Sequence, residues 1–353
     1  MGIPGNSELT AEPETTIRGA FTLLMANLNI SDDRPVIPMS VSEPSAFPCF
    51  STSHIASDAI AEAVQSTDFN GYPAAEGILP ARRAVAEYLS QDLPNKLSPD
   101  DVFMTMGCQQ AALTILHVLG GSKLNILLPK PCFPYYDVFA QTFGLEIRFF
   151  DLLSEKHWEV DLDSVIAVAD ENTVGMVIIN PGNPCGNVFT YSHLKKVHMC
   201  RRSYSLLISF LIIRSIKQYF HISPYPPSFI QGALPHILAK TDKDFFSSVL
   251  NIIKDAANSC YEGLKDIPGV TCPTRPEGSM CLLVKLDISM FEDIKDDLDF
   301  CIKLAKEESV MILPGISVGL PNWLRVTFAI DPSYLEDGIK RLKSFCERHS
   351  KRA

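Results

Sequence analysis

The segment Asn180–Asn187, NPGNPCGN, directly follows an apolar run from Thr173 to Ile179, TVGMVII. Because β-branched and other apolar residues dominate that run, it predicts a buried strand. The strand ends in a turn of Asn, Pro and Gly, which set unusual backbone angles and offer side-chain amides. In open α/β sheets, ligands bind just beyond the carboxyl ends of the strands, so Asn183 is a candidate binding residue.

Predicted strands and helices alternate along the first two thirds of the chain. The predicted order is helix 53–66, helix 81–93, strand 102–106, helix 111–119, strand 126–128, helix 136–143, strand 146–150 and strand 173–179. Such alternation is typical of an α/β domain with a mainly parallel sheet. We assign residues 51–232 to this large domain, and residues 1–50 to an N-terminal arm and part of a small domain.

The last third of the chain has a different order of elements. It predicts a long amphipathic helix at 244–266, two strands within 269–287, a helix at 296–308, strands at 310–313 and 324–328, and a terminal helix at 334–348. Strands and helices here do not alternate regularly. Residues 233–353 are therefore predicted to form a small C-terminal α+β domain.

Composition restricts the class of protein and its partners. The chain has 353 residues, of which 46% are hydrophobic, so it is long enough for two domains and a large core. Its formal net charge of −10 disfavours nucleic acid and an anionic membrane surface as partners. The ten cysteines show no metal-ligand spacing, which favours reduced thiols and a cytoplasmic location. The apolar run Tyr204–Ile213 is about half the length of a membrane-spanning helix, so we expect a buried strand or helix there.

Two further motifs lie beside predicted strand ends. Gly107 and Cys108 lie between a strand and a helix, where free N–H groups and the helix dipole favour an anion such as phosphate. Phe133 and Tyr136 follow the strand at 126–128 and offer flat apolar surfaces. Each pattern also fits ordinary packing when it stands alone.

Tyr72 and Arg325 complete the set of candidates. Tyr72 lies in the turn-rich stretch 70–77, where an exposed turn tyrosine is the alternative interpretation. Arg325 lies in Asn322–Phe328, NWLRVTF, on a predicted strand. A guanidinium binds a carboxylate through two parallel hydrogen bonds. A lone arginine on a strand is more often part of a surface ion pair, so the surrounding motifs decide this interpretation.

Together, and in this order, the motifs resemble the plant branch of the tyrosine aminotransferase family, which includes nicotianamine aminotransferases and C–S lyases. The resemblance runs from about Thr16 to Lys351 and includes Ser42–Phe50, which is similar to a substrate-side loop of the plant members. It implies a pyridoxal 5'-phosphate (PLP)-dependent transferase of fold type I that forms a homodimer. It also implies transamination of tyrosine or a related amino acid with a 2-oxo acid acceptor, with C–S lyase activity as the alternative, and Arg325 as the residue that binds the substrate carboxylate.

The resemblance implies roles for the other candidates. Gly107 and Cys108 would lie in the loop that cradles the PLP phosphate, and Tyr72 would reach that phosphate from the partner subunit. Phe133 would stack on the coenzyme ring, and Asn183 would contact the coenzyme at the end of its strand.

The resemblance stops shortly after the turn. Members of the family continue with an S-D-E-V-Y run, an S-x-S-K run that holds the Schiff-base lysine, and an arginine that clamps the phosphate. Here a predicted helix begins near His193, and by Ser215 the sequence has rejoined the family beyond all three, a gap of roughly 80 residues if two to three strand–helix units are missing. Lys195, Lys196 and Lys217 are predicted to face water, so covalent attachment of PLP is not expected.

Residues 199–214 match nothing in the family, which suggests a frameshifted or aberrantly spliced junction. Loss of about three central strands removes apolar surface from the large domain, and Ser205–Ile213 could add at most one replacement strand. Three hypotheses stay open: an inactive member of the family, a non-catalytic partner in mixed dimers with a full-length paralogue, or an ordinary enzyme that contains the missing strands. Transcript reads that cross residues 199–214 separate the third hypothesis from the other two.

Overall fold

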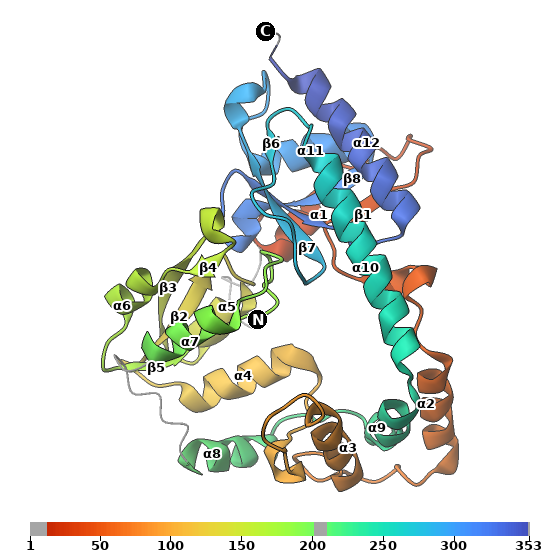
Figure 1. Cartoon of the computed structure of the whole chain (residues 1–353), viewed down its shortest axis with the longest axis vertical. Helices are drawn as coiled ribbons and strands as arrows, with labels where there is room; N and C mark the ends of the chain where they lie inside the picture. Colours follow the sequence, from red (N-terminus) through yellow and green to blue (C-terminus); the bar gives the residue numbers. More distant parts are fainter. Residues whose placement is uncertain (1–12, 201–209, 352–353) are drawn as a thin grey trace, which may run out of the picture.

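The computed structural model describes residues 13–200 and 210–351 (Figure 1). Two sheets organise this part of the chain: a four-stranded sheet in the order β4-β3-β2-β5 and a five-stranded sheet in the order β1-β8-β9-β7-β6. Residues 1–12 of the predicted N-terminal arm, and most of the apolar run that begins at residue 204, lie outside the described residues.

The four-stranded sheet is mainly parallel, as predicted. Its strands are β2 (Asn125–Lys130), β3 (Glu146–Leu153), β4 (Glu159–Val160) and β5 (Thr173–Met176). Strand β2 runs parallel to both β3 and β5, and only the short β4 pairs antiparallel with β3. Strand β5 is shorter than the predicted 173–179, because the chain turns away after the Val177 N–H donates to the Leu127 carbonyl at 2.9 Å.

Helices cover both faces of this sheet, as a parallel sheet requires. Side chains alternate along β2: Ile126 and Leu128 pack in one cluster with Leu116, whereas Leu127 packs in another with Phe150. The first face is covered by α4 (Gly107–Leu119) and α5 (Tyr135–Thr142), and the second by α6 (Leu162–Val168) and α7 (Tyr191–Cys200). The alternation confirms the α/β class that the sequence predicts.

The predicted strand at Val102–Met106 is wrong. These residues pair with no strand in the part of the chain that the structure describes. The Met104 N–H instead donates to the Glu76 carbonyl at 2.9 Å, and Phe103 stacks on Phe220 with ring centroids 5.7 Å apart. A strand needs a hydrogen-bonded neighbour, so an apolar run alone does not create one.

Helix α8 (Phe210–Phe220) lies where we considered a replacement strand. A strand that extends to Ile213 is therefore wrong at its C-terminal end, although residues 201–209 lie outside the described part. The helix packs against α4, with the His117 and Tyr219 rings 4.5 Å apart, and Lys217 is exposed as predicted. Phe220 is almost completely buried, so α8 covers part of the apolar surface beside α4.

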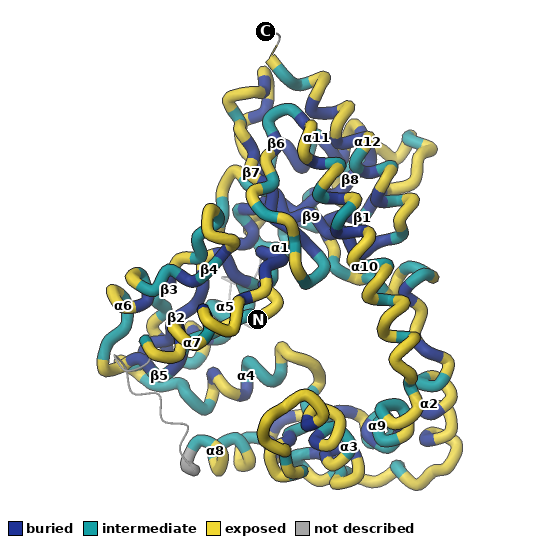
Figure 2. Tube along the Cα trace, in the orientation of Figure 1, coloured by how far each residue is buried: buried dark blue, intermediate teal, exposed yellow. Residues whose placement is uncertain are grey.

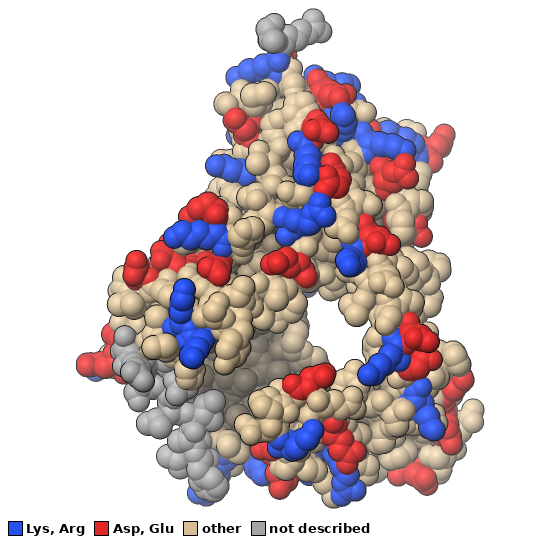
Figure 3. All heavy atoms as spheres, viewed as in Figure 1, with Lys and Arg blue, Asp and Glu red and all other residues tan. Residues whose placement is uncertain are grey.

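Three helices form a separate block: α2 (His54–Ser66), α3 (Leu79–Leu89) and α9 (Ser228–Lys240). Helix α9 packs against both α2 and α3, and it meets α2 through Ala59, Ala63 and Ala233, small side chains that allow close helix contact. An opening passes through the molecule between this block and α10 (Lys243–Leu264) (Figure 3). Because α9 is continuous across residue 232, we place the proposed end of the large domain after Lys240.

The five-stranded sheet contains the most extensive core. Its strands are β1 (Ile37–Met39), β6 (Val270–Thr271), β7 (Cys281–Leu286), β8 (Val310–Pro314) and β9 (Trp323–Thr327), and its helices are α1 (Ile17–Ala26), α10, α11 (Asp297–Glu308) and α12 (Pro332–His349). Only β1 and β8 are parallel, and the other pairs are antiparallel. The strands and the inner faces of the helices are buried (Figure 2), in agreement with the predicted α+β pattern.

Aspartates fix where the helices around this sheet begin. Asp242, Asp296 and Asp331 each cap a helix by accepting a hydrogen bond from a backbone N–H of its first turn. No described helix is long and apolar enough to cross a membrane. All ten cysteines are free thiols in the structure.

Candidate functional site

The Asn180–Asn187 turn closes on itself just beyond β5. The Gly182 N–H donates to the Asn187 carbonyl at 2.8 Å, and the Asn180 side-chain oxygen accepts from the Phe189 N–H at 3.0 Å. Asn183 is half-buried, and its Oδ1 atom is buried without a hydrogen-bond partner among the described residues. A buried carbonyl oxygen without a donor is a group that a ligand or water can satisfy.

The turn also docks on the second sheet. The Gly186 carbonyl accepts from the N–H groups of Glu277 and Gly278 at 2.8 and 3.0 Å. The Cys281 thiol of β7 donates to the Pro184 carbonyl at 3.6 Å. These contacts connect the strand end that carries Asn183 with the sheet that carries Arg325.

The phosphate-loop candidates lie beside the aromatic candidates. Gly107 begins α4 with a φ of +80°, and the Gln110 side chain accepts from the Met106 N–H at 2.6 Å. Burial raises the pKa of Tyr136, and the thiols of Cys108 and Cys132 raise it further. Helix α4 packs against α5, which begins at Tyr135, so the helix that starts at Gly107 and the segment that follows Phe133 belong to neighbouring elements.

Phe133 packs within its own turn. Its ring centroid lies 4.8 Å from that of Tyr135 and 6.5 Å from that of Tyr136. The ring is half-buried, so one part of its surface stays accessible. Aromatic neighbours of this kind hold a ring in a fixed orientation.

Arg325 is buried in the middle of the five-stranded sheet. It lies on β9 opposite Leu283 of β7 and Leu313 of β8, and only 5% of it is exposed. Its Nη2 donates to the Ser40 carbonyl at 2.8 Å, whereas Nε is buried with no partner in the described part of the chain. Burial lowers the pKa of Arg325, because removal from water disfavours the charged form, but an arginine stays protonated near neutrality.

Tyr72 lies apart from the other candidates. It is 95% exposed on the loop between α2 and α3. A single chain therefore shows no contact for its side chain with the Asn183 turn. The predicted role of Tyr72 in a partner subunit stays a prediction.

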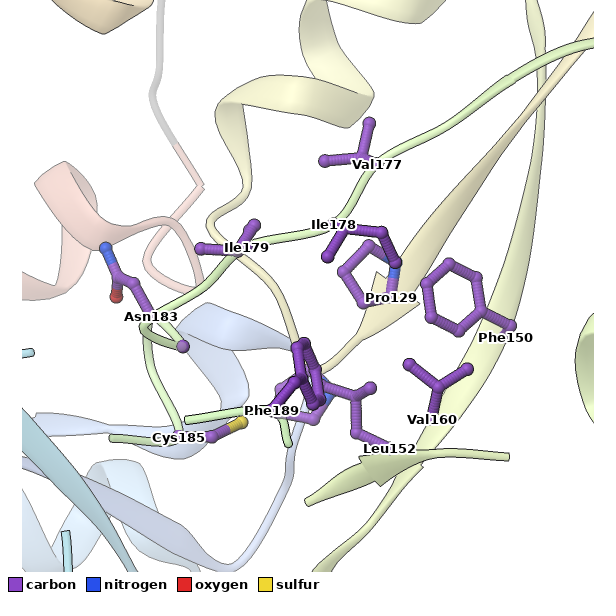
Figure 4. Close-up of a pocket in the computed structure, with 12 residues that line it drawn as sticks. Pro129, Phe150, Leu152, Val160, Val177, Ile178, Ile179, Asn183, Cys185 and Phe189 are labelled. Atoms are coloured by element: carbon purple, nitrogen blue, oxygen red, sulfur yellow. The ribbon is translucent and has the colours of Figure 1, made fainter. Parts of the chain in front are cut away.

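The cavity beside Asn183 is small and apolar. Its volume is about 10 Å³, no more than a single water requires. Pro129, Phe150, Leu152 and Val160 point toward one another around it, whereas the Asn183 amide points away (Figure 4). None of the other predicted site residues lines this cavity.

No lysine is placed to act as a buried amine. All lysines of the chain lie within the described residues, and every one except Lys303 is exposed. Lys303 is half-buried and pairs with Asp293 and Asp299 at 3.3 and 3.2 Å. Burial opposes its charge, but hydrogen bonds to these two carboxylates raise its pKa, the reverse of what a nucleophilic amine needs.

The fold defines the class of protein. Tyrosine aminotransferase from Leishmania infantum superposes with a TM-score of 0.85 at 24% identity, covering 97% of this chain and 99% of that one. Alanine aminotransferase from Pyrococcus furiosus superposes with a TM-score of 0.88 at 19% identity, covering 98% and 100%. The architecture is therefore that of the fold-type I PLP-dependent aminotransferases.

Sequence comparison shows the family. The model of aminotransferase class I and II matches residues 34–210 and 211–342. The chain is 40% identical to S-alkyl-thiohydroximate lyase SUR1 of Arabidopsis thaliana, covering 99% of this chain and 88% of that protein. It is 41% identical to nicotianamine aminotransferase 1 of Oryza sativa subsp. japonica, covering 99% and 82%. The chain therefore belongs to the class I and II aminotransferase family, among its plant tyrosine and nicotianamine aminotransferase relatives, and the resemblance drawn from the motifs is confirmed.

The family depends on pyridoxal 5'-phosphate, but the residues of this chain do not fit a covalently held coenzyme. The N-terminus of α4 and Phe133 offer parts of a phosphate and ring site. No buried lysine accompanies them, and no acidic residue lines the cavity next to Asn183. The missing amine is decisive, because it forms the covalent link to the coenzyme aldehyde.

Sequence reasoning missed two residues of the site. Ser40 accepts a hydrogen bond from Arg325 and is itself almost completely buried, although nothing in its sequence context marks it. Gln110 holds the start of α4 by accepting from Met106 and by donating to Ser223 at 2.9 Å. The sequence offered one indication of this role: Gln110 lies three residues after Gly107, the first residue of α4.

Proposed function

We propose that this chain binds an amino acid or 2-oxo acid through Arg325 and does not transaminate it by itself. The proposal rests on one observation: every lysine of the chain is either exposed to solvent or, in the case of Lys303, held in ion pairs. Transamination requires a lysine amine that condenses with the coenzyme and then moves the proton at the substrate Cα. Arg325 is buried and its Nε has no hydrogen-bond partner among the described residues, so it retains the ability to bind a carboxylate without that amine.

The missing segment is part of the proposal. The alignment with SUR1 extends over 407 residues although this chain has 353, so at least 54 aligned positions (407 − 353) have no counterpart here. The two family-model matches meet between residues 210 and 211, inside the stretch 199–214 in which the motifs find no resemblance. Both findings support the loss of the segment that carries the Schiff-base lysine.

Borohydride reduction in the presence of PLP is expected to leave no lysine stoichiometrically modified. Exposed amines form only transient imines, because no enclosing site protects them from hydrolysis. Peptide mapping by mass spectrometry measures the result, with a full-length plant relative as the positive control. A full pyridoxyl group on a single lysine such as Lys196 or Lys217, or conversion of tyrosine to its 2-oxo acid, would contradict the proposal.

The ancestral reaction is proposed from the relatives. Transamination of tyrosine or a related amino acid with a 2-oxo acid acceptor is the first candidate, and C–S lysis of a cysteine conjugate is the alternative, because the relatives include both an aminotransferase and a lyase. Both substrate classes carry the carboxylate that Arg325 would bind.

A second candidate function is that of a non-catalytic partner in a dimer with a full-length paralogue in the cytoplasm. Its support is the exposed loop and helices around Tyr72, where the tyrosine is 95%, Val64 51% and Leu79 47% exposed. Exposed apolar side chains on this loop and on the two helices that it joins are a kind of surface that a partner can cover. The same surface also suits a homodimer of this chain.

Co-expression of this chain with a tagged full-length relative is the test. We expect the two chains to co-purify at equal amounts, and Tyr72→Ala to lower the activity of the mixed dimer per catalytic site. Tyr191→Ala, at an exposed tyrosine on α7, is the matched control. Recovery of this chain only with itself, or as aggregate, would contradict the partner model.

A further inference from the structure

Backbone hydrogen bonds dock the C-terminal end of α12 on the small domain (Figure 1). The His349 carbonyl accepts from the Glu292 N–H at 2.9 Å, and the Lys351 N–H donates to the Met290 carbonyl at 2.8 Å. The two segments run antiparallel at this point. So short a contact near a chain terminus frays easily unless side chains hold it in place.

The imidazole of His349 lies between two carboxylates at this docked end. Its Nδ1 is 2.7 Å from an oxygen of Asp293, in the loop before α11, and its Nε2 is 3.1 Å from an oxygen of Glu307 on α11. Phe345, one turn earlier on α12, packs on the ring with centroids 4.3 Å apart, and only 12% of the His349 side chain is exposed. An ionised carboxylate only accepts hydrogen bonds, and a neutral imidazole has a single N–H. The protonated ring therefore satisfies both partners, whereas the neutral ring satisfies one.

Ion pairs surround the His349 ring and join α11, α12 and the chain before β1. These pairs are Lys303 with Asp293 at 3.3 Å and with Asp299 at 3.2 Å, Arg348 with Glu307 at 3.0 Å and with Glu308 at 2.6 Å, and Arg34 with Glu308 at 2.7 Å. Exposed carboxylates, lysines and arginines keep their charges between pH 5 and 8, whereas an imidazole changes its charge there. His349 is therefore the member of this network that responds to pH near neutrality.

The pKa of His349 is set by opposing influences. Burial lowers it, but hydrogen bonds to Asp293 and Glu307 outweigh burial and raise the pKa above its usual range. The hydrogen bond to His349 lowers the pKa of Asp293. Burial raises the pKa of Glu307, but its hydrogen bonds to His349 and Arg348 outweigh that effect and lower it. Ring and carboxylates thus stabilise one another in their charged forms.

We propose that His349 is a pH-dependent latch that docks the C-terminal end of α12 on residues 290–292. The imidazolium bridges Asp293 and Glu307 and holds the helix end in place. Deprotonation leaves one carboxylate without its donor and removes the positive charge between the two, so docking weakens. A histidine free of these partners titrates near pH 6.5. Docking is therefore fully favoured below about pH 6.5 and is lost as the pH rises through the higher pKa of the docked ring. The latch involves none of the candidate site residues.

An NMR titration of the full chain, isotope-labelled at histidine Cε1, tests the charge state of the latch. The signal of His349 is assigned as the one that His349→Gln lacks. Its midpoint is expected to lie above pH 6.5, and Asp293→Asn is expected to lower that midpoint, because the ring loses one carboxylate partner. His236→Gln, at an exposed histidine of α9, is the matched control and is expected to leave the midpoint unchanged. A wild-type midpoint at or below pH 6.5, or one that Asp293→Asn does not lower, would overturn the inference.

Hydrogen exchange at single amides shows whether this titration moves the helix end. In wild type, protection of the Glu292 and Lys351 N–H groups, corrected for the intrinsic exchange rate, is expected to fall about 3- to 10-fold between about pH 6 and about pH 9. In His349→Gln the same protection is expected to be lower and independent of pH, because an amide side chain carries no charge. The Leu335 N–H, which donates to the Asp331 carbonyl in the first turn of α12, is the internal control and is expected to stay protected.

Two results of the exchange experiment would overturn the inference. Constant protection of the Glu292 and Lys351 amides across this pH range would show that the charge on His349 does not hold the helix end. An equal loss of protection at Leu335 would show that the whole helix opens, and that the response to pH is not local to the latch. If His349→Gln does not fold, the wild-type protein and Asp293→Asn still decide the question through both measurements.

Discussion

Arg341→Met is expected to destabilise the protein by about 3 kcal/mol, whereas Arg325→Met is expected to leave its stability unchanged or raise it. Both arginines are buried, at 7% and 5% exposure. Removal of Arg341 leaves the carbonyls of Pro35 and Glu308 without a donor and Asp337 without its partner. Loss of a partner from a buried polar network carries the full desolvation penalty of the groups left behind.

Removal of Arg325 leaves only one carbonyl unpaired and eliminates a buried charge that has no acidic partner in the described residues. The two effects oppose each other, so the net change is small. Urea unfolding of both variants without ligand measures the difference. A loss for Arg325→Met as large as that for Arg341→Met would contradict the prediction, because it would show that Arg325 has a structural partner and is not held for a ligand.

Gly186→Ala is expected to destabilise the protein by about 3 kcal/mol. Gly186 has a φ of +71°, and an added Cβ would lie 2.7 Å from the Cys281 carbonyl oxygen. Backbone atoms on both sides of this contact cannot move aside without breaking the hydrogen bonds that dock the turn on the second sheet. The free energy of unfolding in urea is the measurement.

Gly319→Ala is the matched control for this turn. Gly319 has a φ of +83°, but a Cβ added there meets nothing within 4 Å. Only the conformational cost of a left-handed residue applies, about 1 kcal/mol. The difference between the two variants therefore measures the contact between the Asn180–Asn187 turn and β7. Equal losses would contradict the view that this docking matters to stability.

Much of the fold followed from local patterns. Amphipathic spacing predicted the helix at 244–266, which the structure places at Lys243–Leu264. Alternation of strands and helices predicted a mainly parallel sheet, and the structure shows it in the pairing of β2 with β3 and β5. Val102–Met106 carried an equally good strand pattern and formed no strand. The apolar pattern of a segment shows only that the segment tends to be buried. Whether it becomes a strand depends on a second strand, from elsewhere in the chain, with which it can form hydrogen bonds.

Part of the candidate site was also predicted from the sequence, whereas another part was found only in the structure. The motifs identified Asn183, Gly107, Cys108, Phe133 and Arg325. The structure packs α4 against α5 and connects the Asn183 turn to the sheet of Arg325. The motifs gave no sign of Ser40, because a serine after a short strand is common. Its backbone carbonyl accepts from Arg325, and that contact is a property of packing.

By itself, the sequence determined the family of this protein, its α/β class, and the absence of the lysine motif on which the family's chemistry depends. The tertiary structure alone decided that no other lysine is buried in its place, and that Arg325 is buried against the Ser40 carbonyl with its Nε unpartnered among the described residues. Motifs and periodicity are local, and they are read from neighbouring residues. Burial and hydrogen bonding join residues as distant as Ser40 and Arg325, which lie 285 positions apart, so only the folded chain reveals them.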